Sequence, residues 1–327
     1  MTSASRALND APGAGPAPDD GRVGPGLARV CILAAAILFS TGGAAIKATQ
    51  LSGIQVASFR SLVAAAALLL FLPRARRGYR PASLLVGVVY AACMVLFVLA
   101  NKLTTAANTI FLQSTAPLYV LVASPLLLRE PVRRSDLIFI VTIACGLGLF
   151  FLEKKPQASA PNPMLGNILA TVSGVCWAGT LMGLRGLSAR KVEGLTAVVA
   201  GNLIAGLVCL PWALSSSSAL PLAETHLADW LAVAYLGAVQ IGLAYFCLTL
   251  GFRHVPALEA SLLILLEPSL SPVWAYWLQS EVPGVWSIVG GLLVLGSSAA
   301  RGWLSARLTL ARKRVGNRGQ SPPPPLV

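Results

Sequence analysis

The chain has 327 residues, of which 56% are hydrophobic and only 11% are charged. Soluble domains contain about 45–50% apolar and about 25% charged residues, so this composition excludes a soluble enzyme and a disordered or fibrous chain. The net charge of +13 does not indicate nucleic-acid binding, because the basic residues lie between long apolar stretches rather than on a polar domain. An integral membrane protein remains.

Residues 1–26 lack apolar periodicity and are rich in Ala, Pro, Gly and Asp, which predicts a disordered tail. The first apolar run has no convincing cleavage site after it, so we interpret it as a retained helix. Because lipid leaves unpaired backbone groups unsatisfied, every apolar run is expected to be helical. The chain is predicted to be an all-α integral membrane protein with ten transmembrane helices. They are expected at about 27–46, 54–72, 82–101, 104–128, 135–152, 164–184, 195–213, 228–250, 257–278 and 284–303.

The distribution of Lys and Arg predicts the orientation. Most of them fall in alternate loops, at Arg74–Arg80, Arg129–Arg134 and Arg185–Lys191, and in the basic tail 304–327. Because basic loops remain on the cytoplasmic side, both termini are expected in the cytoplasm of a multi-pass protein of the bacterial inner membrane. Lys47 and Lys102 then lie at external span ends, where their side chains are expected to extend to the interface.

An internal repeat divides the chain. Residues 98–130 align with 249–281, and each segment has a mid-helix proline (Pro117, Pro268) followed 13 residues later by a glutamate (Glu130, Glu281). The halves 27–152 and 164–303, joined by a linker at 153–163, contain five expected spans each. An odd number makes the second half enter the membrane from the opposite side, which predicts two inverted five-helix repeats, a common design of secondary transporters.

Several segments resemble one transporter family. They are "FSTGGAAIKA", "ASFRSLVAA", "TAANTIFLQSTAPLYVLVASPLLLREPV" and "ALEASLLILLEPSLSPVWAYWLQSEVP". With these pieces the chain resembles the EamA family of the drug/metabolite transporter superfamily over about residues 27–303. It departs from the family at Phe39-Ser40, where a tryptophan-glycine pair is common. The resemblance implies a central cavity between the halves and alternating-access export of amino acids or related small metabolites. A drug or cation efflux carrier and a channel of the same architecture are the alternatives.

Charged residues within expected spans are the first candidates for substrate binding. Glu259 and Glu267 are the acids within a span, and they lie on roughly one side of the same expected helix. A charged group at a helix centre costs about 2.5–3.5 kcal/mol, so each needs a partner or a wet cavity. A cation or proton site and a structural salt bridge are both open interpretations. Arg60, in the second span, is a candidate to neutralise Glu267 or to bind a substrate carboxylate.

Neutral polar and aromatic side chains complete the candidate substrate-binding set. Asn108 and Gln113 belong to the most polar expected helix, which cannot face lipid and either lines the cavity or bonds to neighbouring helices. Gln240 is a lone polar group near mid-depth. Trp177 and Tyr245 are candidates to wall a substrate pocket.

The sequence lacks the residues that several other functional classes require. Intramembrane aspartyl proteolysis needs paired Asp, and metalloproteolysis needs a motif such as HExxH; the sequence has neither. With two His and no CxxC motif, no metal and no cofactor are expected, and no catalytic residues are assigned. The expected partners are a small metabolite and the lipid bilayer. Protons and a second copy of the chain are left open, and nucleic acid is not expected.

Overall fold

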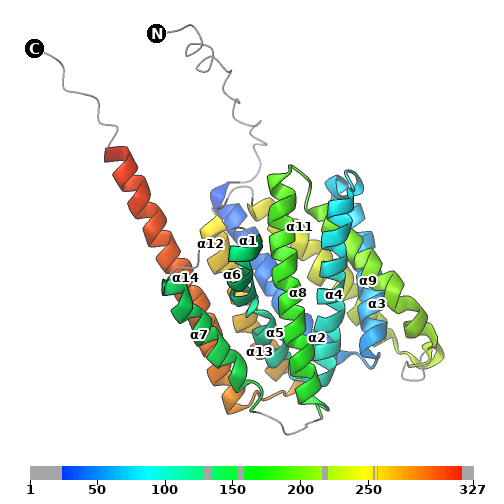
Figure 1. The fold of residues 1–327 in the computed structure, drawn as a ribbon. Coiled ribbons are helices and arrows are strands. Elements are labelled where there is room, and N and C mark those ends of the chain that lie inside the picture. The colour runs from blue at the N-terminus through cyan, green and yellow to red at the C-terminus, as the bar shows by residue number, and fades with distance from the viewer. Residues whose placement is uncertain are drawn as a thin grey trace, which may run out of the picture.

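The structure of the chain is a computed structural model that describes residues 24–127, 134–152, 158–215, 220–252, 255 and 257–318. The regular elements in these residues are helices, packed as a bundle with their axes roughly aligned (Figure 1). Within the described ranges, seven helical segments are long and apolar enough to cross a membrane: Gly26–Ala48, Gly53–Phe71, Pro81–Leu103, Ala106–Ala123, Pro163–Ala189, Leu195–Ser215 and Leu227–Gly251. Shorter apolar helices cover Leu137–Leu149 and Val285–Arg301. The chain is a multi-pass membrane protein.

The helices before residue 153 correspond to the first predicted half. They are α1 (Pro25–Ser40), α2 (Gly42–Ala48), α3 (Gly53–Phe71), the 3-10 turn η2 (Pro73–Arg76), α4 (Pro81–Leu103), α5 (Ala106–Gln113), α6 (Ala116–Leu127) and α7 (Arg134–Leu149). Local signals explain several starts. Ser52 and Gln55 form a capping box at the start of α3, and Thr105 accepts a hydrogen bond from the Asn108 N–H at the start of α5.

The helices of the second half begin after the linker. They are α8 (Pro163–Ala189), α9 (Leu195–Ser215), the 3-10 turn η3 (Leu222–Glu224), α10 (Leu227–Ala234), the π-helix η4 (Tyr235–Leu243), α11 (Ala244–Phe252), α12 (Ala257–Ile264), α13 (Leu266–Gln279) and α14 (Val285–Arg318). Asn162 caps the start of α8, and a proline occupies its first turn, where a missing N–H costs nothing.

Four expected spans are interrupted, which the sequence analysis did not predict. The first is broken at Thr41, where the hydroxyls of Ser40 and Thr41 donate to carbonyls of the preceding turn. The span expected at 104–128 divides into α5 and α6, and the span at 257–278 divides into α12 and α13. Each of these two breaks lies just before Pro117 or Pro268, whose missing N–H leaves a carbonyl one turn back without its helical partner. The fourth, at 228–250, contains the wider turns of η4.

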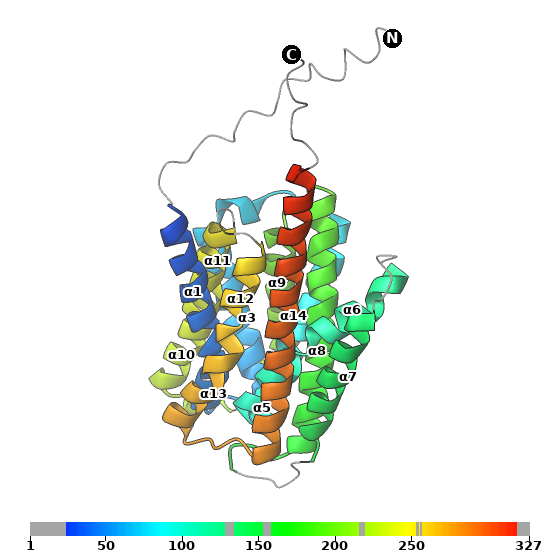
Figure 2. The same cartoon turned by 90° about the vertical axis from the view of Figure 1, so that its left-hand side faces the viewer.

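The two ends of the bundle are identified by ion pairs. Arg29, near the start of α1, pairs with Glu259 near the start of α12, and this end is the α1 end. Lys47, at the end of α2, pairs with Glu281 beyond α13, and this end is the Lys47 end. Helix α14 finishes at the α1 end (Figure 2). It continues to Arg318, beyond 303, where the sequence analysis expected a solvated tail.

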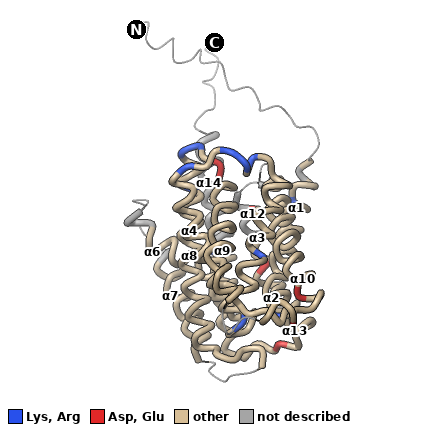
Figure 3. Tube along the Cα trace, turned by 90° about the vertical axis from the view of Figure 1, so that its right-hand side faces the viewer, with Lys and Arg blue, Asp and Glu red and all other residues tan. Residues whose placement is uncertain are grey.

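Lys and Arg gather at the α1 end (Figure 3). The loop between α3 and α4, which carries Arg74, Arg76 and Arg77, lies there. The basic residues Arg129, Arg133 and Arg253 and the repeat glutamate Glu130 lie outside the described residues.

The most extensive packing joins the two predicted halves. Helix α4 packs on α8 and α9, and α3 packs on α9 and η4. Glycines permit the α4–α8 approach, because a Cβ on Gly183 would lie 2.6 Å from the Val86 side chain and one on Gly166 would lie 2.7 Å from the Thr104 nitrogen. Helices α7 and α14 lie side by side along one flank (Figures 1 and 2). The core therefore sits between the halves.

Candidate functional site

Arg60 is a buried cation with no carboxylate against it in the described part of the chain. It lies on α3 with 1% of its surface exposed. One guanidinium nitrogen donates to the Met94 carbonyl at 3.4 Å, and Nε has no partner. Arg60 and Glu267 form no ion pair. An arginine buried in this way retains unused donors and an uncompensated charge, which suits an anionic group.

Tyr90 of α4 joins Arg60 to the second half. Its side chain is 1% exposed and belongs to an apolar cluster against which Trp177 and Tyr245 pack. The Tyr90 hydroxyl lies near the Tyr245 hydroxyl and the Asn202 amide, without a hydrogen bond of ordinary geometry to either. Arg60 is within electrostatic range of Tyr90. Three predicted residues, Arg60, Trp177 and Tyr245, therefore meet around one that the sequence analysis did not select.

Glu267 lies close to this group. It occupies the first turn of α13, directly before Pro268, and keeps part of its surface accessible. No hydrogen bond or ion pair from a described residue reaches its carboxylate, and Tyr245 is within its electrostatic range. An unpaired acid within an apolar span is costly unless it meets water or a ligand, which makes Glu267 the strongest functional candidate among the acids.

The interrupted first span borders the same region. Phe39 packs its ring edge-on against Tyr245, with 5.3 Å between ring centroids. Gln240 of η4 donates weakly to the Phe39 carbonyl at 3.4 Å, and its amide oxygen is buried without a partner. Trp274 of α13 donates from its indole nitrogen to the Ser40 hydroxyl at 2.9 Å. The break at Thr41 is thus held by side chains of the second half.

Gln113 lies on another wall of the interface between the halves. Its amide donates to the Ser173 hydroxyl of α8 at 3.0 Å and approaches the Cys93 sulfur of α4 at 3.4 Å. Cys93 is within electrostatic range of Arg60. These contacts leave Gln113 half-buried and occupied by protein partners, so the structure favours helix bonding over free lining for this side chain.

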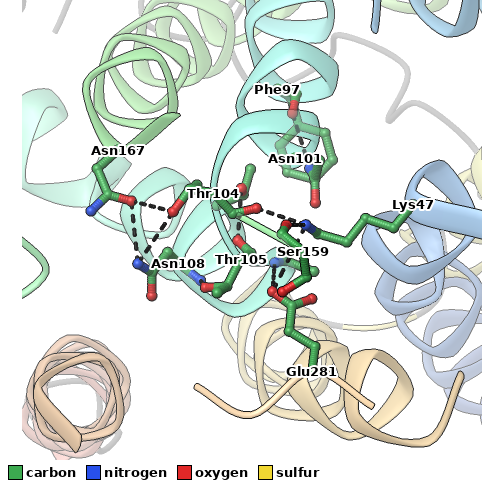
Figure 4. Close-up of polar contacts among 11 residues, drawn as sticks. Lys47, Phe97, Asn101, Thr104, Thr105, Asn108, Ser159, Asn167 and Glu281 are labelled. Carbon is green, nitrogen blue, oxygen red and sulfur yellow. Dashed lines mark hydrogen bonds and ion pairs between the residues drawn. The ribbon is translucent and has the colours of Figure 1, made fainter. Parts of the chain in front are cut away.

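Asn108 belongs to a polar cluster at the Lys47 end, not to the group around Tyr90 (Figure 4). Its amide and the Thr104 hydroxyl both donate to the Asn167 side-chain oxygen, at 3.2 Å and 2.7 Å. The Asn167 amide donates in turn to the Phe150 carbonyl. The Asn108 oxygen has no partner. The structure thus gives Asn108 a role in joining α5 to α8.

Lys47 and Lys102 are not extended to the interface, which corrects the expectation from the sequence. Lys47 donates to the Thr104 carbonyl at the end of α4, at 2.8 Å, and also to the Ser159 carbonyl (Figure 4). Lys102 donates to the Thr49 carbonyl at the end of α2, at 2.7 Å. Each lysine therefore caps the carboxyl end of the other's helix, where the helix dipole favours a cation.

Glu281 is also part of the Lys47 end. Its carboxylate accepts a hydrogen bond from the Ala106 N–H at 2.9 Å and lies 3.9 Å from the Lys47 nitrogen. Burial raises the pKa of Glu281, although Lys47 and the Ala106 N–H act in the opposite direction. One of its carboxylate oxygens has no partner.

Glu259 does not share a site with Glu267 in the described residues, contrary to the expectation that both lie on one side of the same helix. It pairs with Arg29 through two contacts, at 2.6 Å and 3.4 Å, and both side chains are partly exposed at the α1 end. The eight-residue spacing assumed one continuous helix, and the break between α12 and α13 intervenes. Of the two interpretations left open by the sequence, the structure favours a structural salt bridge for Glu259.

Sequence reasoning missed Tyr90 and the capping role of the lysines. Tyr90 could have been selected from the sequence, since it is a lone hydroxyl-bearing aromatic side chain in the middle of an expected span. No feature of the sequence indicated the capping by the lysines, because it depends on two helix ends from distant segments meeting.

Comparisons with known proteins agree with this architecture. The model of the EamA-like transporter family matches residues 27–152 and 164–300. An uncharacterized transporter of Bacillus subtilis (strain 168), YetK, is 26% identical over 155 residues, a match that spans 47% of each chain. One solved crystal structure covers 86% of this chain and 98% of its own with a TM-score of 0.57 and 20% identity, which relates the fold alone. With both halves matched by the family model, the chain belongs to the EamA-like transporter family.

Proposed function

We propose that the chain is a secondary carrier of the bacterial cell membrane that exports an amino acid or a related small metabolite by alternating access. The observation that carries the proposal is a pair of charges, Arg60 and Glu267, neither of which has an oppositely charged partner among the described residues. Arg60 lies on α3, which packs on α9 and η4, and Glu267 lies on α13, which packs on α1, α2 and α5. A zwitterion supplies a carboxylate for the first and an ammonium group for the second. Protons are proposed to compete for Glu267 when the substrate leaves.

The arrangement of helices supports two inverted repeats. Helix α5 begins at the Lys47 end, where Glu281 contacts it, and α13 finishes there. The segments containing Pro117 and Pro268 therefore run in opposite directions. Their breaks fall at equivalent places of the sequence repeat, at Ser114–Thr115 and at Leu265. Ten spans, with both termini in the cytoplasm, are the simplest topology that accounts for these features and for the basic loops of the α1 end.

Transport into proteoliposomes with an imposed pH gradient tests the proposal. We expect Glu267→Gln to transport without responding to the gradient, because an amide takes up no proton. Glu259→Gln is the matched control on the same expected span and should keep the response, since Glu259 is already paired with Arg29. A full response in Glu267→Gln would remove that residue from coupling.

The same preparation separates the alternatives. Arg60→Lys should bind a carboxylate substrate better than Arg60→Met, whereas a carrier of organic cations would lose nothing in Arg60→Met. A conductance far above carrier turnover would favour a channel.

A further inference from the structure

We propose that Glu281 and Asp229 form a two-point latch that holds the Lys47 end closed, an inference that rests on the proposed carrier function. Both carboxylates belong to the second half, and both are buried, at 2% and 3% exposure. Each accepts a hydrogen bond from a backbone N–H of the first half. Glu281 binds the Ala106 N–H at 2.9 Å, and Asp229 binds the Gln50 N–H at 2.7 Å.

Each carboxylate is also attracted to a lysine of the first half. Glu281 is 3.9 Å from the Lys47 nitrogen, and Asp229 is within electrostatic range of Lys102. The lysines keep their positions without the carboxylates, because each is bound to the carboxyl end of a neighbouring helix. The first half thus offers a preformed receptor of two cations and two N–H groups, and the second half offers two anions.

The backbone around Glu281 is shaped for this contact. Ser280 has a left-handed conformation, with φ of 52°, that is uncommon for a residue other than glycine. It ends α13 with the Glu281 N–H donating to the Ala275 carbonyl at 3.3 Å, a helix-terminating turn that directs the chain back toward α5.

A closed latch fits the tight packing directly inside it. A Cβ on Gly43 of α2 would lie 2.9 Å from the Ala106 Cβ and 3.6 Å from the Ser271 hydroxyl of α13. Helices α2 and α13 and the start of α5 therefore meet here. For a carrier to open this end, α13 must separate from α2 and α5, and the two carboxylates must leave their receptors.

Ser271→Cys provides a reporter for opening. Ser271 is 2% exposed and lies eight residues before the end of α13 at Gln279, about 12 Å along the helix axis. A membrane-impermeant thiosulfonate is added on the side of the Lys47 end, and modification is measured in Ser271→Cys protein that also carries Glu281→Gln, Asp229→Asn or both. Protein without Ser271→Cys gives the background from its own cysteines.

We expect each charge-neutralising variant to raise the modification rate about tenfold. This change corresponds to about 1.4 kcal/mol less free energy favouring the closed state. The double variant should raise the rate further. Glu224→Gln is the matched control, because Glu224 is an exposed carboxylate in the loop between α9 and α10, at the same end. Thermal unfolding in detergent identifies any variant that fails to fold. Lys47→Met removes the cation beside Glu281 and should also raise the modification rate.

Equal modification rates in Glu281→Gln, Asp229→Asn and Glu224→Gln would overturn the latch while leaving Glu267-dependent transport intact. If Ser271→Cys cannot be modified from either side, with or without substrate, the carrier mechanism itself fails. If the protein with both carboxylates present is already fully modified from the Lys47 end, that end is not closed.

Discussion

Single polar residues decide how the helices of this bundle are joined. Asn167 is fully buried in α8 and satisfies groups from three segments: the Thr104 hydroxyl, the Asn108 amide and the Phe150 carbonyl. In an apolar environment these groups cannot turn to water, so removing the Asn167 amide would leave them buried without a partner.

Asn167→Ala is expected to destabilise the fold. Each buried group left without a partner costs about 1–3 kcal/mol, so the apparent melting temperature in detergent should fall clearly. Thr171→Ala is the control, because the Thr171 hydroxyl bonds only to the backbone of its own helix, one turn away. A similar melting temperature for both variants would contradict the joining role of Asn167.

At the scale of elements, glycines determine how closely α8 approaches α4. Gly166 faces the end of α4, where an added Cβ would lie 2.6 Å from the Thr104 Cβ and 2.9 Å from the Leu103 carbonyl carbon. Backbone atoms at a helix end cannot move as a flexible side chain can. Gly186, near the other end of α8, has nothing within 4 Å.

Gly166→Ala should therefore lower the melting temperature, and Gly186→Ala should leave it unchanged or raise it. In the second variant alanine improves helix propensity by about 1 kcal/mol and meets no obstacle. Measuring both in one detergent compares the same substitution on the same helix. The close approach of α4 and α8 would be refuted by a Gly166→Ala protein as stable as its Gly186→Ala counterpart.

Elements were partly predictable. The apolar runs are helical where the structure describes them, and seven of these helical segments are long and apolar enough to cross a membrane. Hydrophobicity over about 20 residues determines which segments can lie in lipid. The breaks at Thr41, Ser114–Thr115 and Leu265 were not predicted, although Pro117 and Pro268 had been identified. A proline only removes one hydrogen bond, and whether the helix bends or divides depends on the partners that neighbouring helices supply.

At the scale of the whole molecule, the loops alternate between two ends of the bundle. The α1 end is basic, and at the Lys47 end the lysines bind backbone carbonyls of the protein. The exposed loop with Arg77 belongs to the α1 end, and the exposed loop with Glu224 belongs to the Lys47 end. Because basic loops remain on the cytoplasmic side, we propose that the α1 end faces the cytoplasm.

Arg77→Cys and Glu224→Cys test this orientation. In intact cells an impermeant thiol reagent should label Glu224→Cys at once and Arg77→Cys only after the membrane is opened, because the loops face opposite solvents. The protein without either change corrects for the native cysteines. Labelling of both loops from one side would exclude the alternating topology.

Part of the candidate site could be predicted from the sequence, and the rest depended on how the whole molecule is arranged. Arg60, Trp177, Tyr245 and Glu267 were selected as rare polar, charged or aromatic groups within apolar spans. The fold places Trp177 and Tyr245 against the cluster that contains Tyr90, Arg60 within electrostatic range of Tyr90, and Glu267 within electrostatic range of Tyr245. Asn108 and Glu259 carried the same signal, yet they lie in polar contacts at opposite ends of the bundle. A sequence records which groups need a polar partner but not which partner is within reach.

The sequence by itself determined the membrane class, the helical character of the apolar segments and the family, because each depends on hydrophobicity, charge and motifs that are local along the chain. Only the tertiary structure decided that Lys47 and Lys102 cap each other's helices and that Glu281 reaches Ala106. It also decided that Glu259 is neutralised by Arg29, whereas no described residue pairs with Glu267. Those outcomes depend on distances between segments far apart in the chain. In a medium that supplies no water, such distances decide whether a charge is paired or available to a ligand.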